Sequence, residues 1–350
     1  MELLENLLWL CRIPSPTGEE RDLADELARR LAALPLASPP RRYGDSLVAP
    51  LTRGSGGPKI LLVGQLDVAN PGQRGEARTE NKRVLGAGAA EKSGLCLMLD
   101  LAERRPQVHA DITLVFHARG ACGFDASELR VVMKQDAELR GADFALVLKP
   151  TDNKLQLGSG GSTHATLAFA GRTGHSGLPG AGVNAIHKFA RVLSQLVAFE
   201  PVPDVVDGLT WYEMMNATSA HGGRSGSVVA DHLEVNVHHT YGPSTSSHAS
   251  QERLMALVDR VGAVRFEELS RPAPPNRNHA LIAALEQSGV QGVEARQTWT
   301  EVASFTTLGI PAANFGPGAE RTMHALNEVT ELSELARAQT ILDSWFAKMT

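Results

Sequence analysis

Lys59-Ile60-Leu61-Leu62-Val63-Gly64 is a short, almost entirely apolar run, and Gln65-Leu66-Asp67-Val68 follows it directly. Continuous apolar runs of this length are typical of strands that are buried on both faces of a parallel sheet. The same alternation continues with apolar runs at 112–116 and 144–148 and with helical patterns at 92–104 and 126–134. Strands that are separated by helices predict an α/β domain with a mainly parallel sheet.

The pattern changes beyond residue 160. Segments 163–169 and 233–237 alternate apolar and polar residues, as half-buried antiparallel strands do. Helical patterns cover about 183–199 and 251–261, and the proline-rich segment 271–275 is a natural linker. The sequence therefore predicts an α/β domain formed by 1–160 and 271–350, which a smaller α+β domain at 161–270 interrupts.

The composition excludes several classes of protein. The 34 Lys and Arg against 39 Asp and Glu give a net charge of −5, so we expect no nucleic-acid partner. No apolar run approaches the roughly 20 residues that a membrane helix needs, so we expect no membrane partner. The three cysteines are odd in number and widely spaced, which indicates the reducing cytoplasm rather than a disulfide framework.

Several motifs lie in order along nearly the whole chain: Ile13–Glu20, Gly64–Val68, Gly86–Gly94, His175–Pro179, Gly182–His187, Trp299–Glu301, Asn314–Gly318 and His324–Glu328. Together they resemble the co-catalytic di-zinc amidohydrolases, the family of succinyl-diaminopimelate desuccinylase, acetylornithine deacetylase and aminoacylase. The desuccinylase branch is the most similar. The resemblance implies a zinc-exopeptidase-like catalytic domain, a lid or dimerisation domain, a homodimer formed through that lid, and hydrolysis of the linear amide bonds of N-acyl amino acids.

In this family two zinc ions activate a water molecule and a glutamate acts as general base. Carried over position by position, Gln65 stands where the first histidine ligand is expected, and Lys149 stands where a glutamate ligand is expected. Ala118-Arg119-Gly120-Ala121 covers an adjacent pair of glutamates. The bridging aspartate falls at Ala90 or Glu91, and only His324 matches its ligand directly.

These substitutions argue against a two-zinc centre. A glutamine amide is a poor zinc ligand and an ammonium has no lone pair. We therefore expect no cofactor, with one zinc ion held by His324 and Glu91 as the alternative. We expect Lys149 to replace a lost cation and to pair with Asp67 or Glu91, and we expect Glu91 to form its ion pair with Lys149 or Lys92.

The candidate catalytic residues are Asp67, Glu91, Lys149 and His175, and the candidate substrate-binding residues are Asn184, Gly316, Pro317 and Gly318. His175 matches the lid histidine that, in the family, reaches across a dimer to the scissile carbonyl. Cys122 as a nucleophile with His117 as its base is a further arrangement, for which a packed thiol is the simpler interpretation.

Three functions follow from these residues. The first is a degenerate desuccinylase-like homologue that binds a small N-acyl amino acid, a related ligand or a partner, or that catalyses a metal-independent reaction. The second is a mononuclear zinc N-acyl-amino-acid amidohydrolase that uses His324, Glu91 and Asp67. The third is a regulatory subunit that pairs with an active paralogue through the lid.

Overall fold

The computed structural model describes residues 3–69, 77–123, 125–325 and 327–349. The chain forms two compact units. Unit 1 comprises residues 1–158, 275–295 and 301–350, and unit 2 comprises residues 159–274 and 296–300. The sequence placed the domain changes after residues 160 and 270, and it did not anticipate that 296–300 belongs with unit 2.

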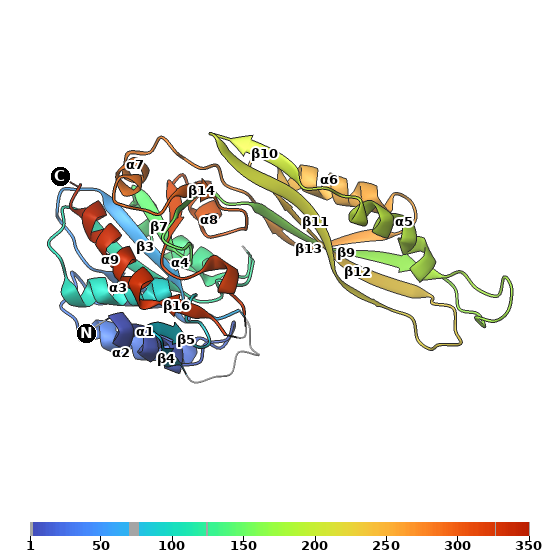
Figure 1. The fold of residues 1–350 in the computed structure, drawn as a ribbon, viewed down its shortest axis with the longest axis horizontal. Helices are drawn as coiled ribbons and strands as arrows, with labels where there is room; N and C mark the ends of the chain where they lie inside the picture. Colours follow the sequence, from blue (N-terminus) through green and yellow to red (C-terminus); the bar gives the residue numbers. More distant parts are fainter. Residues whose placement is uncertain (1–2, 70–76, 124, 326, 350) are drawn as a thin grey trace. The chain divides into compact units, whose positions relative to one another are not determined.

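Unit 1 is built on an eight-stranded, mainly parallel sheet (Figure 1). In spatial order its strands are β1 (Arg41–Tyr43), β2 (Ser46–Pro50), β6 (Asp111–His117), β3 (Lys59–Gln65), β7 (Phe144–Leu148), β15 (Ala312–Phe315), β8 (Leu155–Leu157) and β14 (Val293–Ala295). The four central strands β6, β3, β7 and β15 all run parallel. The predicted α/β class with a mainly parallel sheet is confirmed.

The central strands are buried on both faces, which explains their nearly continuous apolar sequence. Every residue of β7 is buried, and so is every residue of β3 after Lys59. By contrast, β1 and β2 pair antiparallel with their neighbours, and β1 is only three residues long and partly exposed. Such short edge segments depend on pairing with the rest of the sheet, and the local pattern did not predict them.

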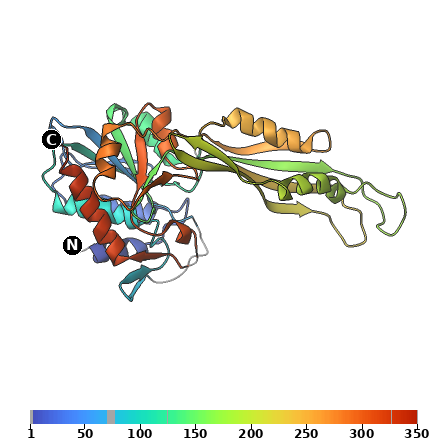
Figure 2. The same cartoon turned by 45° about the horizontal axis from the view of Figure 1, so that its top comes forward.

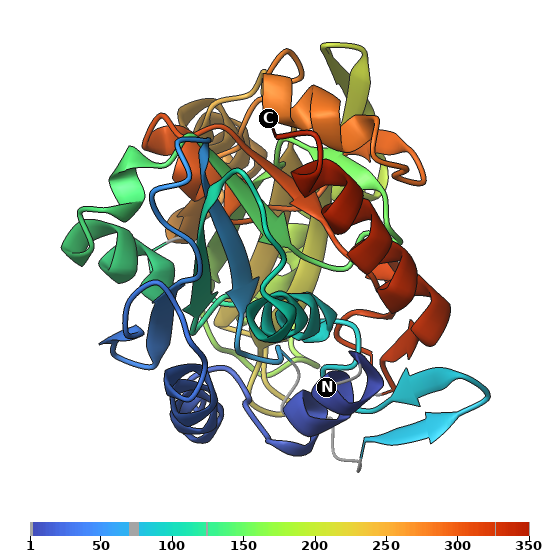
Figure 3. The same cartoon turned by 90° about the vertical axis from the view of Figure 1, so that its left-hand side faces the viewer.

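The helices of unit 1 are α1 (Leu3–Arg12), α2 (Arg21–Ala32), α3 (Ser93–Arg104), α4 (Glu128–Gln135), α7 (Ala280–Glu286), α8 (Val302–Thr307) and α9 (Leu332–Phe346). Two short 3₁₀ turns, η1 (Leu139–Gly141) and η2 (Glu320–Thr322), accompany them. Helices α1, α3 and α9 pack together over one face of the sheet (Figure 3). Helix α3 approaches β7 so closely that a Cβ on Gly94 would lie 2.4 Å from the Leu148 carbonyl oxygen.

A three-stranded antiparallel sheet completes unit 1 and consists of β4 (Arg78–Glu80), β5 (Arg83–Leu85) and β16 (Val329–Glu331). This small sheet joins the segment before α3 to the segment before α9. In the part of the chain that is described, no helix has the length and apolar character needed to cross a membrane.

Unit 2 contains a five-stranded antiparallel sheet with two helices (Figures 1 and 2). Its strands in spatial order are β10 (Val202–Val206), β11 (Leu209–Gly222), β12 (His232–Tyr241), β9 (Gly161–Ala170) and β13 (Ala263–Ser270), and its helices are α5 (Ala185–Val197) and α6 (Ser247–Val258). Apolar residues of α5 and α6 form one core with the inward-facing residues of the sheet.

The sequence predicted β9, β12 and α5 in unit 2, and it placed α6 four residues too late. Ser246 caps α6 by accepting a hydrogen bond from the Ala249 amide, 3.1 Å away. Strands β10, β11 and β13 were not predicted. The second half of β11 is exposed at every residue from Asn216 to Gly222, so no alternation of apolar and polar residues marks it.

Candidate functional site

The carboxyl ends of the four central strands meet at one edge of the unit 1 sheet, which we call the carboxyl edge. The strands end there at Gln65, His117, Leu148 and Phe315, and the register pairs Gln65 with His117 and Leu148 with Phe315. Ligand sites of open α/β sheets lie at this edge. Of the residues predicted from sequence, the structure brings Asp67, Glu91, Lys149, His324 and the 316–318 loop to it.

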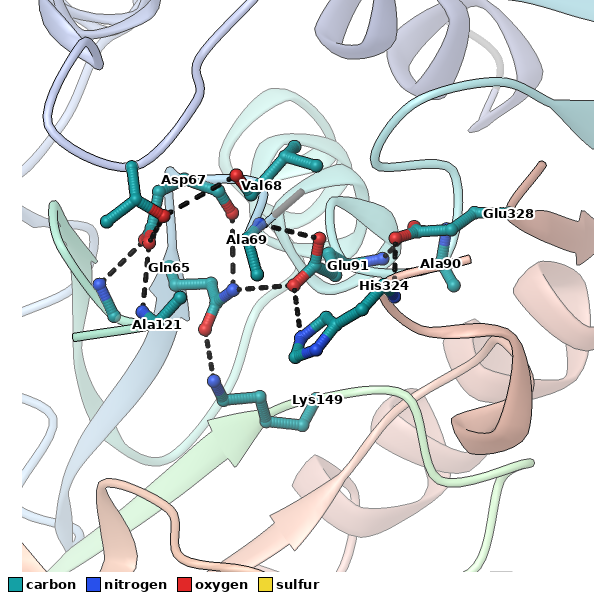
Figure 4. A network of polar contacts seen from close by, with 12 residues as sticks. Gln65, Asp67, Val68, Ala69, Ala90, Glu91, Ala121, Lys149, His324 and Glu328 are labelled. Carbon is teal, nitrogen blue, oxygen red and sulfur yellow. Dashed lines mark hydrogen bonds and ion pairs between the residues drawn. The ribbon is translucent and has the colours of Figure 1, made fainter. Parts of the chain in front are cut away.

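Lys149 follows β7 directly and lies among polar side chains (Figure 4). Its Nζ contacts Gln65 Oε1 and lies 3.2 Å from Glu301 Oε1. The side chain is 13% exposed, whereas that of Glu301 is fully buried. The sequence predicted Asp67 or Glu91 as the partner of Lys149. The structure corrects this, because the carboxylate that pairs with Lys149 is that of Glu301.

Glu301 directly precedes α8 and faces a second basic side chain. His117 Nε2 lies 3.4 Å from Glu301 Oε1, and both side chains are fully buried. Burial alone would raise the pKa of Glu301, but the charge of Lys149, the largest opposing influence, holds it below its ordinary value. Burial lowers the pKa of His117, so its imidazole is neutral at pH 7. Lys149 is therefore the cation that compensates the Glu301 carboxylate.

Glu91 has a different partner from the one predicted. Its Oε1 lies 3.2 Å from His324 Nε2 and accepts a 3.2 Å hydrogen bond from Gln65 Nε2 (Figure 4). The hydrogen bond to Glu91 raises the pKa of His324 above its ordinary value, and partial burial opposes this. Lys92 instead donates to the Leu10 and Ile13 carbonyl oxygens, at 3.0 and 2.8 Å. The ion pair of Glu91 is thus with His324.

Glu328 positions both members of this pair. It is fully buried, and its carboxylate accepts hydrogen bonds from the backbone amides of Ala90, Glu91 and His324 at 3.0, 3.2 and 3.1 Å. His324 itself has a φ of 62°, which is uncommon for a residue other than glycine. Left-handed residues of this kind cluster at functional sites. Glu328 thus holds the backbone of His324 in place.

Asp67 anchors a loop. Its carboxylate accepts hydrogen bonds from the amides of Gly120 and Ala121, at 2.7 and 2.9 Å, and from the Thr17 hydroxyl at 2.9 Å. The loop is so tightly packed that a Cβ on Gly120 would lie 2.6 Å from the Gln65 Cβ. Asp67 is therefore surrounded by donors of its own chain.

The loop 316–318 is also held by internal hydrogen bonds. The Gly316 carbonyl accepts from the Asn153 amide at 3.0 Å, and the Pro317 carbonyl accepts from the Ser93 hydroxyl at 2.9 Å. The Gly318 carbonyl accepts from the Asp152 amide at 2.9 Å. These contacts assign the loop a structural role, and substrate binding by it stays a prediction.

His175 and Asn184 belong to unit 2, and their contacts lie within that unit. The Gly177 amide donates to His175 Nδ1 at 3.0 Å, so the proton of the neutral ring is on Nε2. Asn184 Oδ1 accepts hydrogen bonds from the amides of Ile186 and His187, at 2.9 and 3.3 Å, and so caps α5. Their catalytic and substrate-binding roles stay predictions.

Sequence reasoning missed two features. It did not connect Glu301 with Lys149, although Glu301 belongs to the Trp299–Glu301 motif. It also did not identify the partners of His239 in unit 2, which lies 2.7 Å from Ser250 Oγ and 3.0 Å from Glu213 Oε1. Ser250 and His239 are fully buried, so this cluster stabilises the core and is closed to substrate.

The side chains at the carboxyl edge do not fit a two-metal centre. Zinc binds histidine nitrogen, carboxylate oxygen or thiolate. Lys149 offers an ammonium, Gln65 offers an amide, and the carboxylates of Glu91, Glu301 and Asp67 already have partners within the chain. Within residues 3–69, 77–123, 125–325 and 327–349, no three His, Cys, Asp or Glu side chains are grouped so that they could hold a metal ion.

Comparison with known proteins identifies the family. Residues 157–264 match the peptidase dimerisation domain of the M20 peptidases. The chain is 31% identical to a putative succinyl-diaminopimelate desuccinylase of Mycobacterium tuberculosis, over 95% of this chain and 94% of that protein. It is 26% identical to the succinyl-diaminopimelate desuccinylase of Corynebacterium glutamicum, over 97% and 94%.

Solved structures share the fold. A tripeptidase of Staphylococcus aureus superposes with a TM-score of 0.79 at 20% identity, over 98% of this chain and 96% of that one. An M20 family metallo-carboxypeptidase of Sulfolobus solfataricus gives a TM-score of 0.79 at 16% identity, over 99% and 98%. The chain therefore belongs to the M20 peptidase family, a family of hydrolases, and within it to the relatives of succinyl-diaminopimelate desuccinylase.

Proposed function

We propose that this chain is a metal-independent member of the family that binds a small N-acyl amino acid, or a related ligand, at the carboxyl edge. The observation that carries the proposal is the placement of Lys149, whose ammonium contacts Gln65 and pairs with Glu301. Together with the Glu91–His324 pair, it gives the buried acids partners from the chain itself. Glu301 and Glu91 thus each have a basic partner without a bound cation.

Reversion of single positions tests the proposal. We expect Gln65→His, and separately Lys149→Glu, to leave hydrolysis of a panel of N-acyl amino acids at background, because each restores one donor of a set that lacks several. The panel includes N-succinyl and N-acetyl amino acids, measured with and without added zinc. Appreciable hydrolysis by either single variant would contradict the proposal.

A mononuclear zinc amidohydrolase is the second candidate, and the proximity of His324 to Glu91 favours it. The two side chains lie 3.2 Å apart, and the His324 side chain is 54% exposed. This candidate predicts one tightly held zinc per chain, lost in His324→Ala. His248→Ala is a matched control, because His248 lies 3.4 Å from Glu252 but belongs to unit 2 and is far more exposed.

We infer a homodimer formed through unit 2. The match to a peptidase dimerisation domain supports it. So does the outer side of α5, where Ile186, Leu193 and Val197 are 46%, 43% and 78% exposed. Their spacing of seven and four residues places them on one side of the helix, separate from the buried Phe189 and Leu196.

A further inference from the structure

Glu301 is a buried carboxylate at the carboxyl edge, and within the described residues Lys149 is the cation that contacts it. Its side chain is fully buried, and an ionised carboxylate in such a place needs a charged partner. His117 is equally buried and neutral, which leaves Lys149 as the compensating cation. The 3.2 Å contact between Lys149 and Glu301 is an ion pair rather than a well-aligned hydrogen bond, and the neutral His117 lies 3.4 Å from the same oxygen.

The ammonium is also fixed in position. The backbone of Lys149 follows β7 and packs closely against Gly316. A Cβ on Gly316 would lie 2.5 Å from the Lys149 carbonyl oxygen. Its Nζ is held between Gln65 Oε1 and Glu301 Oε1, which come from the end of β3 and the start of α8. A lysine ammonium has three N–H donors, and the hydrogen bond to Gln65 uses one of them.

The ammonium therefore keeps N–H donors for a ligand. Within the described part of the chain, the polar atoms that contact Lys149 Nζ are Gln65 Oε1 and Glu301 Oε1. The side chain keeps 13% of its surface accessible, in contrast to the closed Glu301 and His117. A preorganised, partly desolvated ammonium of this kind binds oxygen anions through charge-assisted hydrogen bonds.

We propose that Lys149, positioned by Glu301 and Gln65, is a tethered cation that binds the carboxylate of a small ligand at the carboxyl edge. The inference rests on the proposed function and names the chemical class of its ligand. Glu301 acts through Lys149 and is a positioning residue. The ligand is recognised by its negative charge, so the corresponding neutral amide is not bound.

Calorimetric titration of the full-length chain tests this with N-acetylglycine, succinate and, as the neutral probe, N-acetylglycinamide. We expect the carboxylates to bind and the amide to fail. Lys149→Met should weaken carboxylate binding about 10- to 100-fold, the value of one charge-assisted hydrogen bond. Lys154→Met is the matched control, because Lys154 pairs with Glu294 at 2.9 Å on the exposed surface of the same unit. It should leave binding unchanged.

The double variant Lys149→Met/Glu301→Gln separates binding from folding. Removing both charges should restore most of the melting temperature that either single change loses, yet the double variant should bind carboxylates as weakly as Lys149→Met does. Equal binding of the amide, binding by the folded double variant, or no carboxylate binding by the wild type would overturn the proposal. Zinc retained by the wild type would instead overturn the metal-independent function, so the two failures are distinguishable.

Discussion

At the scale of single residues, the pairing of Lys149 with Glu301 explains how an acidic carboxyl edge is stable. A buried carboxylate is tolerated when a charge and polar groups compensate it. Here the compensating charge belongs to Lys149, which directly follows β7. The carboxylate belongs to Glu301 at the start of α8, more than 150 positions further along the chain. Chain folding itself therefore brings the two charges together.

Removing one member of this pair should be costly. We predict that Lys149→Met lowers the free energy of unfolding by about 3–5 kcal/mol, because it leaves Glu301 buried without its cation. Lys154→Met, at the exposed pair with Glu294, should cost about 0–1 kcal/mol. Urea denaturation followed by circular dichroism measures both. Equal effects of the two variants would show that Lys149 is not the counter-ion of Glu301.

Lys92 gives a prediction about pH. Burial lowers its pKa from 10.5 to about 8. Between these values the unfolded chain binds the proton and the folded chain does not, so stability rises with pH there, by about 1.4 kcal/mol per unit. Below pH 8 the contribution is constant.

Comparison with Lys92→Met isolates this effect from all other titrations. The difference in unfolding free energy between wild type and variant should shift in favour of the wild type from pH 8 to pH 10. It should be flat from pH 6 to pH 7.5. A difference that does not change with pH above 8 would show that the folded pKa of Lys92 is not lowered.

At the scale of elements, two roles can be tested for Asn184: capping of helix α5 and binding of substrate. Its side chain accepts hydrogen bonds from two amides at the start of α5. We predict that Asn184→Ala costs about 1 kcal/mol of stability and that Asn184→Asp retains most of it, because aspartate is an equally good cap. Carboxylate affinity should be unchanged in both. Loss of ligand affinity without loss of stability would support the substrate-binding role expected from sequence.

Helix α5 also carries the prediction about assembly. Val197→Asp combined with Leu193→Asp should convert a dimer to a monomer, because the charges would be buried at the interface. Val131→Asp is the control, since Val131 is 44% exposed on α4 of unit 1. Light scattering after size-exclusion chromatography gives the mass. A wild type that is monomeric alone but binds an active paralogue would favour the regulatory subunit instead.

The elements that the sequence predicted are those whose pattern is local. Strands β3, β6 and β7 are continuous apolar runs between helices, and α5 has a clear apolar side. Strand β11 was missed because its second half is exposed and has no alternation of apolar and polar residues. Its pairing with β12 is a tertiary interaction, which no window of sequence contains.

At the scale of the whole molecule, the residue types of the candidate site were predictable but their pairing was not. The resemblance assigned Lys149, Glu91 and His324 to one site, and in the structure these side chains lie at the same edge of the sheet. The partners were wrong because ion pairs depend on distances of a few ångströms, which sequence spacing does not give. Glu301 in particular lies at the start of α8 and pairs with Lys149 at the end of β7, a residue far from it in sequence.

The metal content of the purified full-length chain tests the central claim most directly. Elemental mass spectrometry is done after incubation with zinc and again after washing with a chelator, and His248→Ala serves as a control for adventitious surface binding. The account predicts less than about 0.1 zinc per chain after the wash, since the donor set at the carboxyl edge is incomplete. One zinc per chain that resists the wash and disappears in His324→Ala, or two, would contradict it.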